Sequence, residues 1–339
     1  MEIIMLRDIP FFWRKRCWQS WVLLPLSLIF RALVLLRRQL YRLGVIASYR
    51  APVPVIVVGN VTVGGNGKTP LVIALVNALQ EKGWKVGVIS RGYGGNRRKP
   101  VLVNEKSDVR TVGDEPLLIH QKTRAPVSVY YRRQRAIENL LMHFPETELI
   151  ISDDGLQHYA LQYDCALLAI AADFGLGNGF CLPAGALREP LPPFATIDAI
   201  ITTGKMSTAL PISAPQFVTT FKNDQFYRSN GERISIETLK ENPLYVVTAI
   251  ARPERFLNRL HALGISPVIS KIFADHAMLH ESMLTFAADG LILMTTKDQV
   301  KTQNWSAFWQ EKIIVLSDEL TIDEELISLI LSCATRTRK

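Results

Sequence analysis

The sequence predicts an α/β protein of two domains, and three observations support this prediction. An apolar, β-branched run at residues 53–59 leads into a glycine-rich turn and then a helical pattern at residues 71–83. The same strand-then-helix alternation continues after residue 85, and it resumes at residue 244 after a stretch of weak periodicity. Such alternation is typical of parallel sheets with helices on both faces, and 339 residues suffice for two cores. We expect a basic helical segment at 1–50, a larger domain at 51–210, a hinge at 211–242 and a smaller α/β domain at 243–339.

The glycine-rich turn reads G-N-V-T-V-G-G-N-G-K-T-P at residues 59–70. Backbone N–H groups of such a turn, with a helix N-terminus behind them, wrap a polyphosphate. Lys68 is expected to reach the β- and γ-phosphate oxygens, and Thr69 to hold Mg²⁺. Thr62 replaces the usual first glycine, so the turn is closer to the G-G-x-G-K-T variant of some ATPases. An ordinary surface turn is the alternative, which the flanking strand and helix disfavour. The pattern predicts a P-loop NTPase-like domain that binds ATP through Thr62, Val63, Gly64, Gly65, Asn66, Gly67, Lys68 and Thr69.

Acidic residues follow two other elements of this domain. An apolar strand at residues 149–152 ends in Asp153 and Asp154, where a P-loop enzyme holds or orients Mg²⁺. Asp114 and Glu115 stand at a turn before a helix, so Asp114 either caps that helix or faces the phosphates. The predicted metal ligands are Thr69, Asp153, Asp154 and Glu115, and either of the two adjacent acids could be the direct ligand.

Two loops are candidates for binding a second substrate. Arg91 begins a basic, glycine-rich loop at the carboxyl end of the strand at 85–90, which is the ligand side of an open α/β sheet. The long Gly/Pro-rich connection at 173–190 contains Asn178, Arg188 and Glu189. Loops of that length in compact domains are usually functional or disordered. We expect these residues to contact the acceptor; a solvated turn and a surface ion pair are the alternatives.

The N-terminal segment carries most of the net charge. The first 50 residues hold nine basic and two acidic side chains, a balance of +7 out of the chain's +8. Residues 10–42 are rich in Trp and Leu, but Arg31 interrupts the apolar stretch before it reaches the ~20 residues of a bilayer span. This pattern favours a helix lying on an anionic membrane surface. A helix packed on the body and a single span with Arg31 snorkelling remain alternatives.

The charge balance and the cysteine and histidine spacing argue against several other kinds of binding site. Outside the first 50 residues the chain is nearly neutral, so we expect no nucleic-acid partner. The four cysteines show no metal-binding spacing and are expected to be reduced thiols. His276 and His280 stand four residues apart, but without further ligands a zinc site is disfavoured. Asp275 and His276 more plausibly cap a helix or present a base to the cleft.

Taken in order, the motifs resemble one known family. These are the loop at 59–70, S-R-G-Y-G, V-G-D-E-P, D-D-G-L-Q-H, G-N-G with L-P-A-G-A-L-R-E-P, F-x-D-H and T-T-K-D. Their combination, over residues 10–300, resembles the tetraacyldisaccharide 4′-kinases of lipid A synthesis. The family often has Pro where this chain has Ala186.

The resemblance implies Mg²⁺-dependent transfer of phosphate from ATP to the 4′-hydroxyl of a tetraacylated glucosamine disaccharide 1-phosphate, giving lipid IVA. It implies a location at the cytoplasmic face of a Gram-negative inner membrane, with two α/β domains hinged across the site. It also favours Asp114 with His276 as the proton acceptor, beside the catalytic Lys68. We expect a monomer. The rival class is a membrane-targeting or partitioning ATPase, which shares the loop but needs neither an acceptor pocket nor a second domain.

Overall fold

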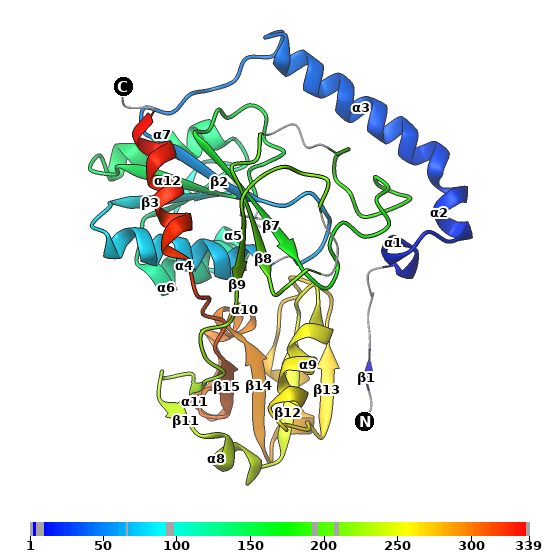
Figure 1. Cartoon of the computed structure of the whole chain (residues 1–339). Coiled ribbons are helices and arrows are strands. Elements are labelled where there is room, and N and C mark those ends of the chain that lie inside the picture. Colours follow the sequence, from blue (N-terminus) through cyan, green and yellow to red (C-terminus); the bar gives the residue numbers. More distant parts are fainter. Residues whose placement is uncertain are drawn as a thin grey trace.

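The computed structural model describes residues 3–4, 10–65, 67–92, 98–191, 196–206 and 210–336, which form two sheet domains (Figure 1). The larger domain contains an eight-stranded sheet in which all strands are parallel except the first edge strand. Its order is β4 (Val101–Leu102), β5 (Val127–Val129), β3 (Val86–Ser90), β6 (Leu149–Asp153), β2 (Val55–Gly59), β7 (Cys165–Ala171), β8 (Ala199–Thr203) and β9 (Gln216–Thr219).

Helices cover both faces of this sheet. On one face, α4 (Lys68–Glu81), α6 (Asp114–Thr123) and α12 (Glu324–Arg336) pack with Leu75, Leu117 and Ile330 into a common apolar core. On the other face, α7 (Arg133–His143) buries Ile137 and Leu140. The short α5 (Val109–Val112) precedes α6. The prediction of a P-loop NTPase-like parallel sheet with helices on both faces is therefore confirmed.

The smaller domain is built on a seven-stranded sheet. Its order is β1 (Ile3–Ile4), β13 (Ile269–Ile272), β12 (Leu244–Thr248), β14 (Leu291–Thr295), β15 (Ile313–Leu316), β10 (Phe226–Arg228) and β11 (Arg233–Ile234). The first five strands are parallel, whereas β10 and β11 are antiparallel to their neighbours. The helices are α8 (Ile236–Lys240), α9 (Pro253–Ala262), α10 (Thr296–Gln299) and α11 (Ala307–Gln310), with three 3₁₀ turns at Glu281–Met283, Thr285–Ala287 and Val300–Thr302.

Two predicted domain boundaries need correction. The expected hinge at 211–242 is not a linker throughout, because β9 extends the larger sheet and β10 and β11 extend the smaller one. The expected smaller domain at 243–339 also ends too late, because α12 packs against α4, β2 and β7 of the larger domain. After β2 the chain therefore passes from the larger domain to the smaller one and back again, and these two crossings pair with each other: Thr321 N donates to Thr220 O at 2.9 Å and Lys222 N to Glu319 O at 2.8 Å.

The N-terminal segment forms α1 (Phe11–Arg14), α2 (Trp18–Val22) and α3 (Leu24–Arg42), and α3 runs along the outside of the larger domain (Figure 1). Ser27 fastens it by donating to the Cys181 carbonyl at 2.7 Å. Within the described part of the chain, no helix combines the length and apolarity needed to cross a membrane. We name the exposed large apolar side chains of α2 and α3 the N-terminal apolar face: Trp18, Trp21, Val22, Leu26, Leu28, Ile29, Leu33, Leu35 and Leu36.

Candidate active site

The glycine-rich turn lies where β2 passes into α4. Gly67 adopts a left-handed conformation at φ 72°, and a Cβ there would lie 3.2 Å from the Thr203 hydroxyl, so the turn requires glycine. The next residue, Lys68, begins α4 and directs its ammonium back across the turn. Its Nζ lies 3.1 Å from Asn60 Oδ1 and 2.9 Å from Asp154 Oδ1. The turn thus presents a helix N-terminus and a fixed cation to one space, as phosphate binding requires.

Most of the predicted loop residues surround that space. Thr62 is buried, and its neighbour Val63 is held by a hydrogen bond from its N–H to the Ala186 carbonyl at 2.9 Å. A cavity lies against Val63 and most of the residues that follow it up to Pro70, namely Gly64, Gly65, Gly67, Lys68 and Thr69. Asn66 lies outside the described residues.

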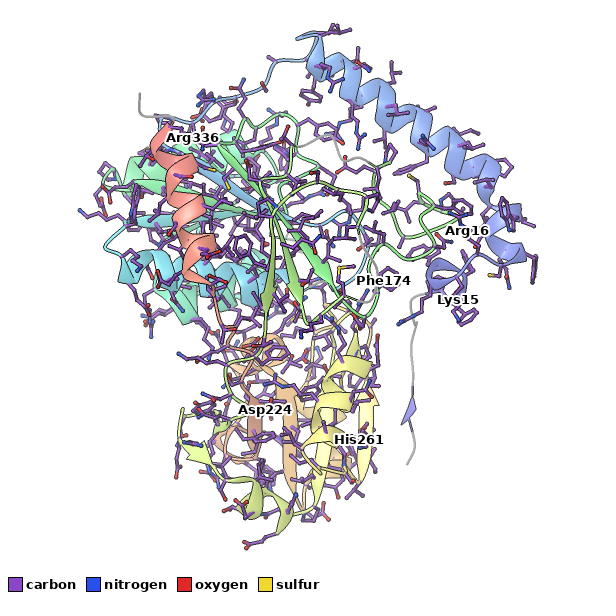
Figure 2. All side chains as sticks on the ribbon, in the orientation of Figure 1. Lys15, Arg16, Phe174, Asp224, His261 and Arg336 are labelled. Carbon is purple, nitrogen blue, oxygen red and sulfur yellow. The ribbon has the colours of Figure 1, made fainter. Side chains whose placement is uncertain are left out.

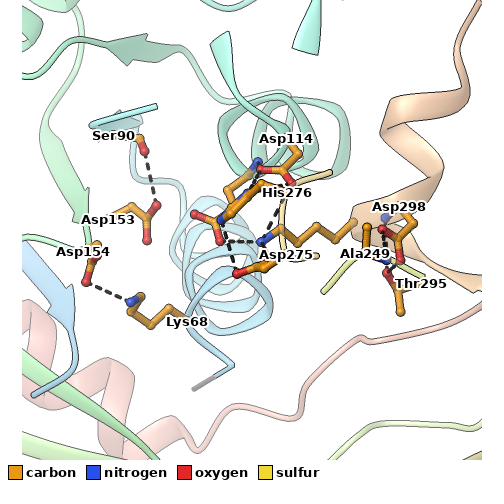
Figure 3. Close-up of polar contacts among 12 residues, drawn as sticks. Lys68, Ser90, Asp114, Asp153, Asp154, Ala249, Asp275, His276, Thr295 and Asp298 are labelled. Carbon is orange, nitrogen blue, oxygen red and sulfur yellow. Dashed lines mark hydrogen bonds and ion pairs between the residues drawn. The ribbon is translucent and has the colours of Figure 1, made fainter. Parts of the chain in front are cut away.

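Asp153 ends β6 beside the turn and is 2% exposed. Its Oδ2 accepts from the Ser90 hydroxyl at 3.3 Å, while its Oδ1 has no hydrogen-bond partner within the described ranges (Figure 3). Burial, followed by the negative charges of Glu115 and Asp154, raises the pKa of Asp153 to about 7. Such a carboxylate is buried, has one oxygen without a hydrogen bond and lies near other negative charges. A cation bound to that oxygen would stabilise its ionised form.

Asp154 is in a different state from its neighbour. It has a left-handed backbone at φ 50° and pairs with both Lys68 Nζ and Arg188 Nη1 at 2.9 Å. Burial alone would raise the pKa of Asp154, but these two cations outweigh it, so the pKa lies below its usual value. Asp154 is therefore an ionised carboxylate that already has two positive partners.

A carboxylate–histidine pair connects the two domains. Asp114, at the start of α6, is 4% exposed, and both its oxygens lie 3.0 Å from Nδ1 of His276, which comes from the smaller domain (Figure 3). Burial opposes ionisation of Asp114, but the hydrogen bond with His276 and the charges of Lys297 and Lys301 hold the pKa of this carboxyl well below its usual range. For His276, burial lowers the pKa, but the Asp114 bond outweighs it and the net shift is upward. The structure therefore brings into contact the two residues that the family resemblance paired as the proton acceptor.

Lys297 adds a second polar link across the domain boundary. Its Nζ lies 3.0 Å from Oε1 of Glu115 and 3.5 Å from Oδ1 of Asp275. Glu115, a predicted metal ligand, is thus already paired with a cation. Within the described ranges, no group of three or more acidic, histidine or cysteine side chains could hold a metal ion. Asp153 differs in having a buried oxygen without a hydrogen-bond partner among the described residues.

The cavity between the domains has a volume of about 940 Å³. The larger domain contributes the phosphate loop, Glu115, Asp154 and Arg188, and the smaller domain contributes His276 and Lys297. A space of this size holds a nucleotide together with part of a second substrate. The phosphate loop and the carboxylate–histidine pair thus face one chamber.

The predicted acceptor residues separate into two groups. Arg188 lines the cavity beside Asp154, and Arg91 is exposed at the end of β3. The assignment of Glu189 to the acceptor is wrong in this structure: its side chain is 0% exposed and bonds to Arg38 of α3, Gln157 and Tyr159. A carboxylate with that many internal partners ties α3 to the domain instead.

The predicted contact of Asn178 with the acceptor is also wrong in this structure. It is buried, and its amide nitrogen donates to the Phe12 and Ala184 carbonyls at 2.7 and 2.8 Å. A Cβ on Gly185 would lie 2.1 Å from Asn178 Oδ1, so the loop closes tightly around this side chain. Asn178 therefore fixes the loop and the α1 segment against each other, which the spacing in the sequence did not reveal.

Sequence reasoning missed two polar residues near the cavity. Asn60 follows β2 directly and, although it does not line the cavity, accepts a hydrogen bond from Lys68. Arg252 follows β12 after a short turn and lines the cavity. Polar residues after the carboxyl ends of parallel strands were the available signal for both.

A phosphate loop that faces a carboxylate–histidine pair across one cavity between two domains is the arrangement of a P-loop phosphotransferase, because transfer to a hydroxyl needs both a phosphate-binding loop and a proton acceptor. Comparison with known proteins narrows this class. The family model described as tetraacyldisaccharide-1-P 4′-kinase (LpxK) matches residues 19–335, and the chain belongs to this family.

Relatives agree with this membership. The tetraacyldisaccharide 4′-kinase of Pasteurella multocida is 44% identical over 308 residues, covering 87% of this chain and 91% of the relative. That of Dechloromonas aromatica is 41% identical over 320 residues, covering 94% and 93%. The crystal structure of Aquifex aeolicus LpxK, an "apo" form in complex with ATP, is 27% identical with a TM-score of 0.78, covering 93% of this chain and 99% of that chain. The partitioning-ATPase alternative is therefore set aside.

Proposed function

We propose that this chain transfers the γ-phosphoryl group of ATP to the 4′-hydroxyl of tetraacyldisaccharide 1-phosphate, the step of lipid A synthesis that gives lipid IVA. The observation that carries the proposal is the pairing of Asp114 and His276 across the domain boundary, opposite the phosphate loop and within one cavity. Family membership and the ATP complex of the Aquifex relative support the choice of reaction and donor.

Lys68 and the loop amides bind the terminal phosphates and neutralise the charge that is transferred. A sugar hydroxyl is a weak nucleophile, so its proton must be accepted as the bond to phosphorus forms. His276 lines the cavity and Asp114 lies behind it, so the proton reaches the pair through His276. Asp114 orients the imidazole and stabilises its protonated form. Each domain supplies one member, so the acceptor is complete only when the domains are closed.

Mg²⁺ fits this site as a cofactor. The side chains that would bind it are Thr69, which follows Lys68 in the phosphate loop, and Asp153, which has a buried oxygen with no hydrogen bond among the described residues. Asp154 and Glu115 are paired with cations and lie near enough to contribute charge. When bound, Mg²⁺ supplies positive charge to the phosphate oxygens.

The N-terminal apolar face and its arginines suit a monomeric enzyme attached to an anionic membrane surface, at the cytoplasmic face of the Gram-negative inner membrane. Exposed Trp, Leu and Ile would enter the headgroup boundary, and the exposed Arg31 would meet lipid phosphates. A lipid substrate would then reach the cavity from the membrane. The near-neutral remainder of the chain offers no counterpart to nucleic acid.

A direct assay tests the reaction. Purified protein is mixed with γ-labelled ATP, Mg²⁺ and tetraacyldisaccharide 1-phosphate in detergent micelles, and labelled lipid is separated by thin-layer chromatography. Label must appear in a product phosphorylated at the 4′ position and must disappear when Lys68→Ala protein is used. Hydrolysis of ATP without labelled lipid would contradict the proposal.

A further inference from the structure

Arg252 is a buried arginine that uses only part of its hydrogen-bonding capacity. It directly precedes α9 and is 3% exposed. Its Nη1 donates to Asp173 Oδ1 at 3.1 Å. Its Nε and Nη2 are buried and have no hydrogen-bond partner in the described part of the chain. A buried N–H donor of a charged group that has no hydrogen-bond acceptor costs free energy. Such donors therefore indicate that a ligand normally accepts their hydrogen bonds.

The surroundings of Arg252 are rich in positive charge. The same carboxylate, Asp173, also accepts two hydrogen bonds from Arg255, at 2.8 and 3.0 Å. Phe174, at the junction of α9 with the larger domain (Figure 2), has the guanidinium carbons of Arg252 at 4.5 Å and Arg14 at 5.6 Å from its ring centroid. Three arginines therefore share these contacts, and Glu254 is paired with one of them, Arg14, at 3.4 Å.

Arg252 remains a cation at neutral pH. Burial, with a smaller effect from neighbouring arginines, lowers its pKa to about 10, while Asp173 opposes the shift. The Phe174 ring lies against this guanidinium, whose planar fork of donors matches a phosphate better than a point charge does.

Arg252 also lies against the phosphate loop. A Cβ built on Gly65 would be 3.9 Å from Arg252 Cγ and 3.3 Å from Ala251 Cβ. Gly65 and Arg252 line the same cavity, from opposite domains. We propose that Arg252 is a phosphate-binding residue, which the smaller domain presents to the cavity beside the phosphate loop. The inference rests on the proposed function, because that function brings phosphate groups into this cavity: the triphosphate of ATP and, at the other end of the acceptor disaccharide from its 4′-hydroxyl, the 1-phosphate.

Binding measurements on the full chain test this inference. The variants are Arg252→Gln and Arg252→Lys, with Asp173→Asn as the matched control that removes the present partner. The ligands are ATP, ADP, the acceptor 1-phosphate in micelles and the same acceptor without its phosphate. Melting curves establish whether each variant is folded. If Arg252→Gln is unfolded, the comparison with the wild type is made with Arg252→Lys alone.

We expect Arg252→Gln to weaken binding of one phosphorylated ligand by about tenfold or more, and Arg252→Lys to weaken it less. If the affinity falls for ATP but not for ADP, Arg252 binds the γ-phosphate. If the affinity falls only for the phosphorylated acceptor, Arg252 binds the 1-phosphate. Asp173→Asn should change affinity by no more than about twofold, because Asp173 is partly exposed.

Two results would overturn the inference. Unchanged affinities in folded Arg252 variants would show that no phosphate is bound there. Equal losses in Arg252→Gln and Asp173→Asn would show that Arg252 only joins the domains. Neither measurement needs turnover, so an inactive wild-type protein would contradict the proposed function without deciding the role of Arg252.

Discussion

Replacing the two members of the carboxylate–histidine pair, singly and together, gives the sharpest test of the proton-accepting unit. In Asp114→Asn the amide keeps the shape of the carboxyl group but loses the charge that faces Nδ1 of His276 at 3.0 Å. A hydrogen bond to a charged group is worth ~1.5–3 kcal/mol, and ~1.4 kcal/mol is a factor of ten. We therefore expect kcat to fall by about tenfold to a hundredfold.

His276→Ala removes the group that faces the cavity and should lower kcat further, by about 10² to 10⁴. In the proposed mechanism Asp114 acts through His276, so the double variant should be about as slow as His276→Ala alone. Initial rates are measured at saturating ATP and acceptor in micelles. His261→Ala is the control, since this exposed α9 histidine lies in the same domain as His276 and outside the lining of the cavity.

The structure also requires one check of stability. Oδ2 of Asp114 lies 3.7 Å from Nζ of Lys301 and 3.9 Å from Nζ of Lys297. Asp114→Asn therefore loses these ion pairs as well as the histidine contact. Thermal melting separates this loss from the effect on turnover. If the double variant loses the product of the two single losses, the residues act independently and the reasoning is refuted.

Three further outcomes follow from the geometry. Lys68→Ala should reduce phosphoryl transfer at least about a hundredfold in a folded protein, and near-normal turnover would rule out the phosphate-loop reading. Burial and neighbouring arginines lower the pKa of His158 to about 4 from 6.5, so the unfolded chain binds a proton there that the folded protein does not. Stability should fall as the pH drops from 6.5 towards 4, and the melting temperature of His158→Gln should fall less over that window; parallel curves would contradict this. Changing Ile29, Leu33 and Leu36 together to Gln should weaken co-sedimentation with anionic liposomes more than about a hundredfold while ATP binding is retained, and unchanged sedimentation would exclude these side chains from the membrane contact.

Much of the fold could be predicted from the sequence, because local patterns define it. The β-branched runs and the glycine-rich turn predicted β2, α4 and β6, and polar residues at strand ends predicted the chamber. The contact of Asp114 with His276 followed from the family resemblance, since 162 residues separate them and no period connects them.

Other features depend on contacts that no local pattern encodes. Glu189 and Arg188 are neighbours in one loop, yet one side chain is enclosed against α3 and the other faces the cavity. The direction of a loop side chain is set by tertiary partners, here Arg38 and Tyr159 for Glu189. For the same reason the sequence assigned the C-terminal residues to the smaller domain, whereas α12 covers the larger sheet.

The return of α12 to the larger domain sets an order of assembly during synthesis. Leu326, Ile327 and Ile330 belong to the core over α4, but they leave the ribosome after every strand of the smaller domain. A nascent chain that stops near residue 320 has all its nucleotide-loop elements and still exposes the part of the larger domain's apolar core that α12 covers, over α4, β2 and β7. The ATP-binding half of the molecule therefore completes its core last, once the inserted half has already been made.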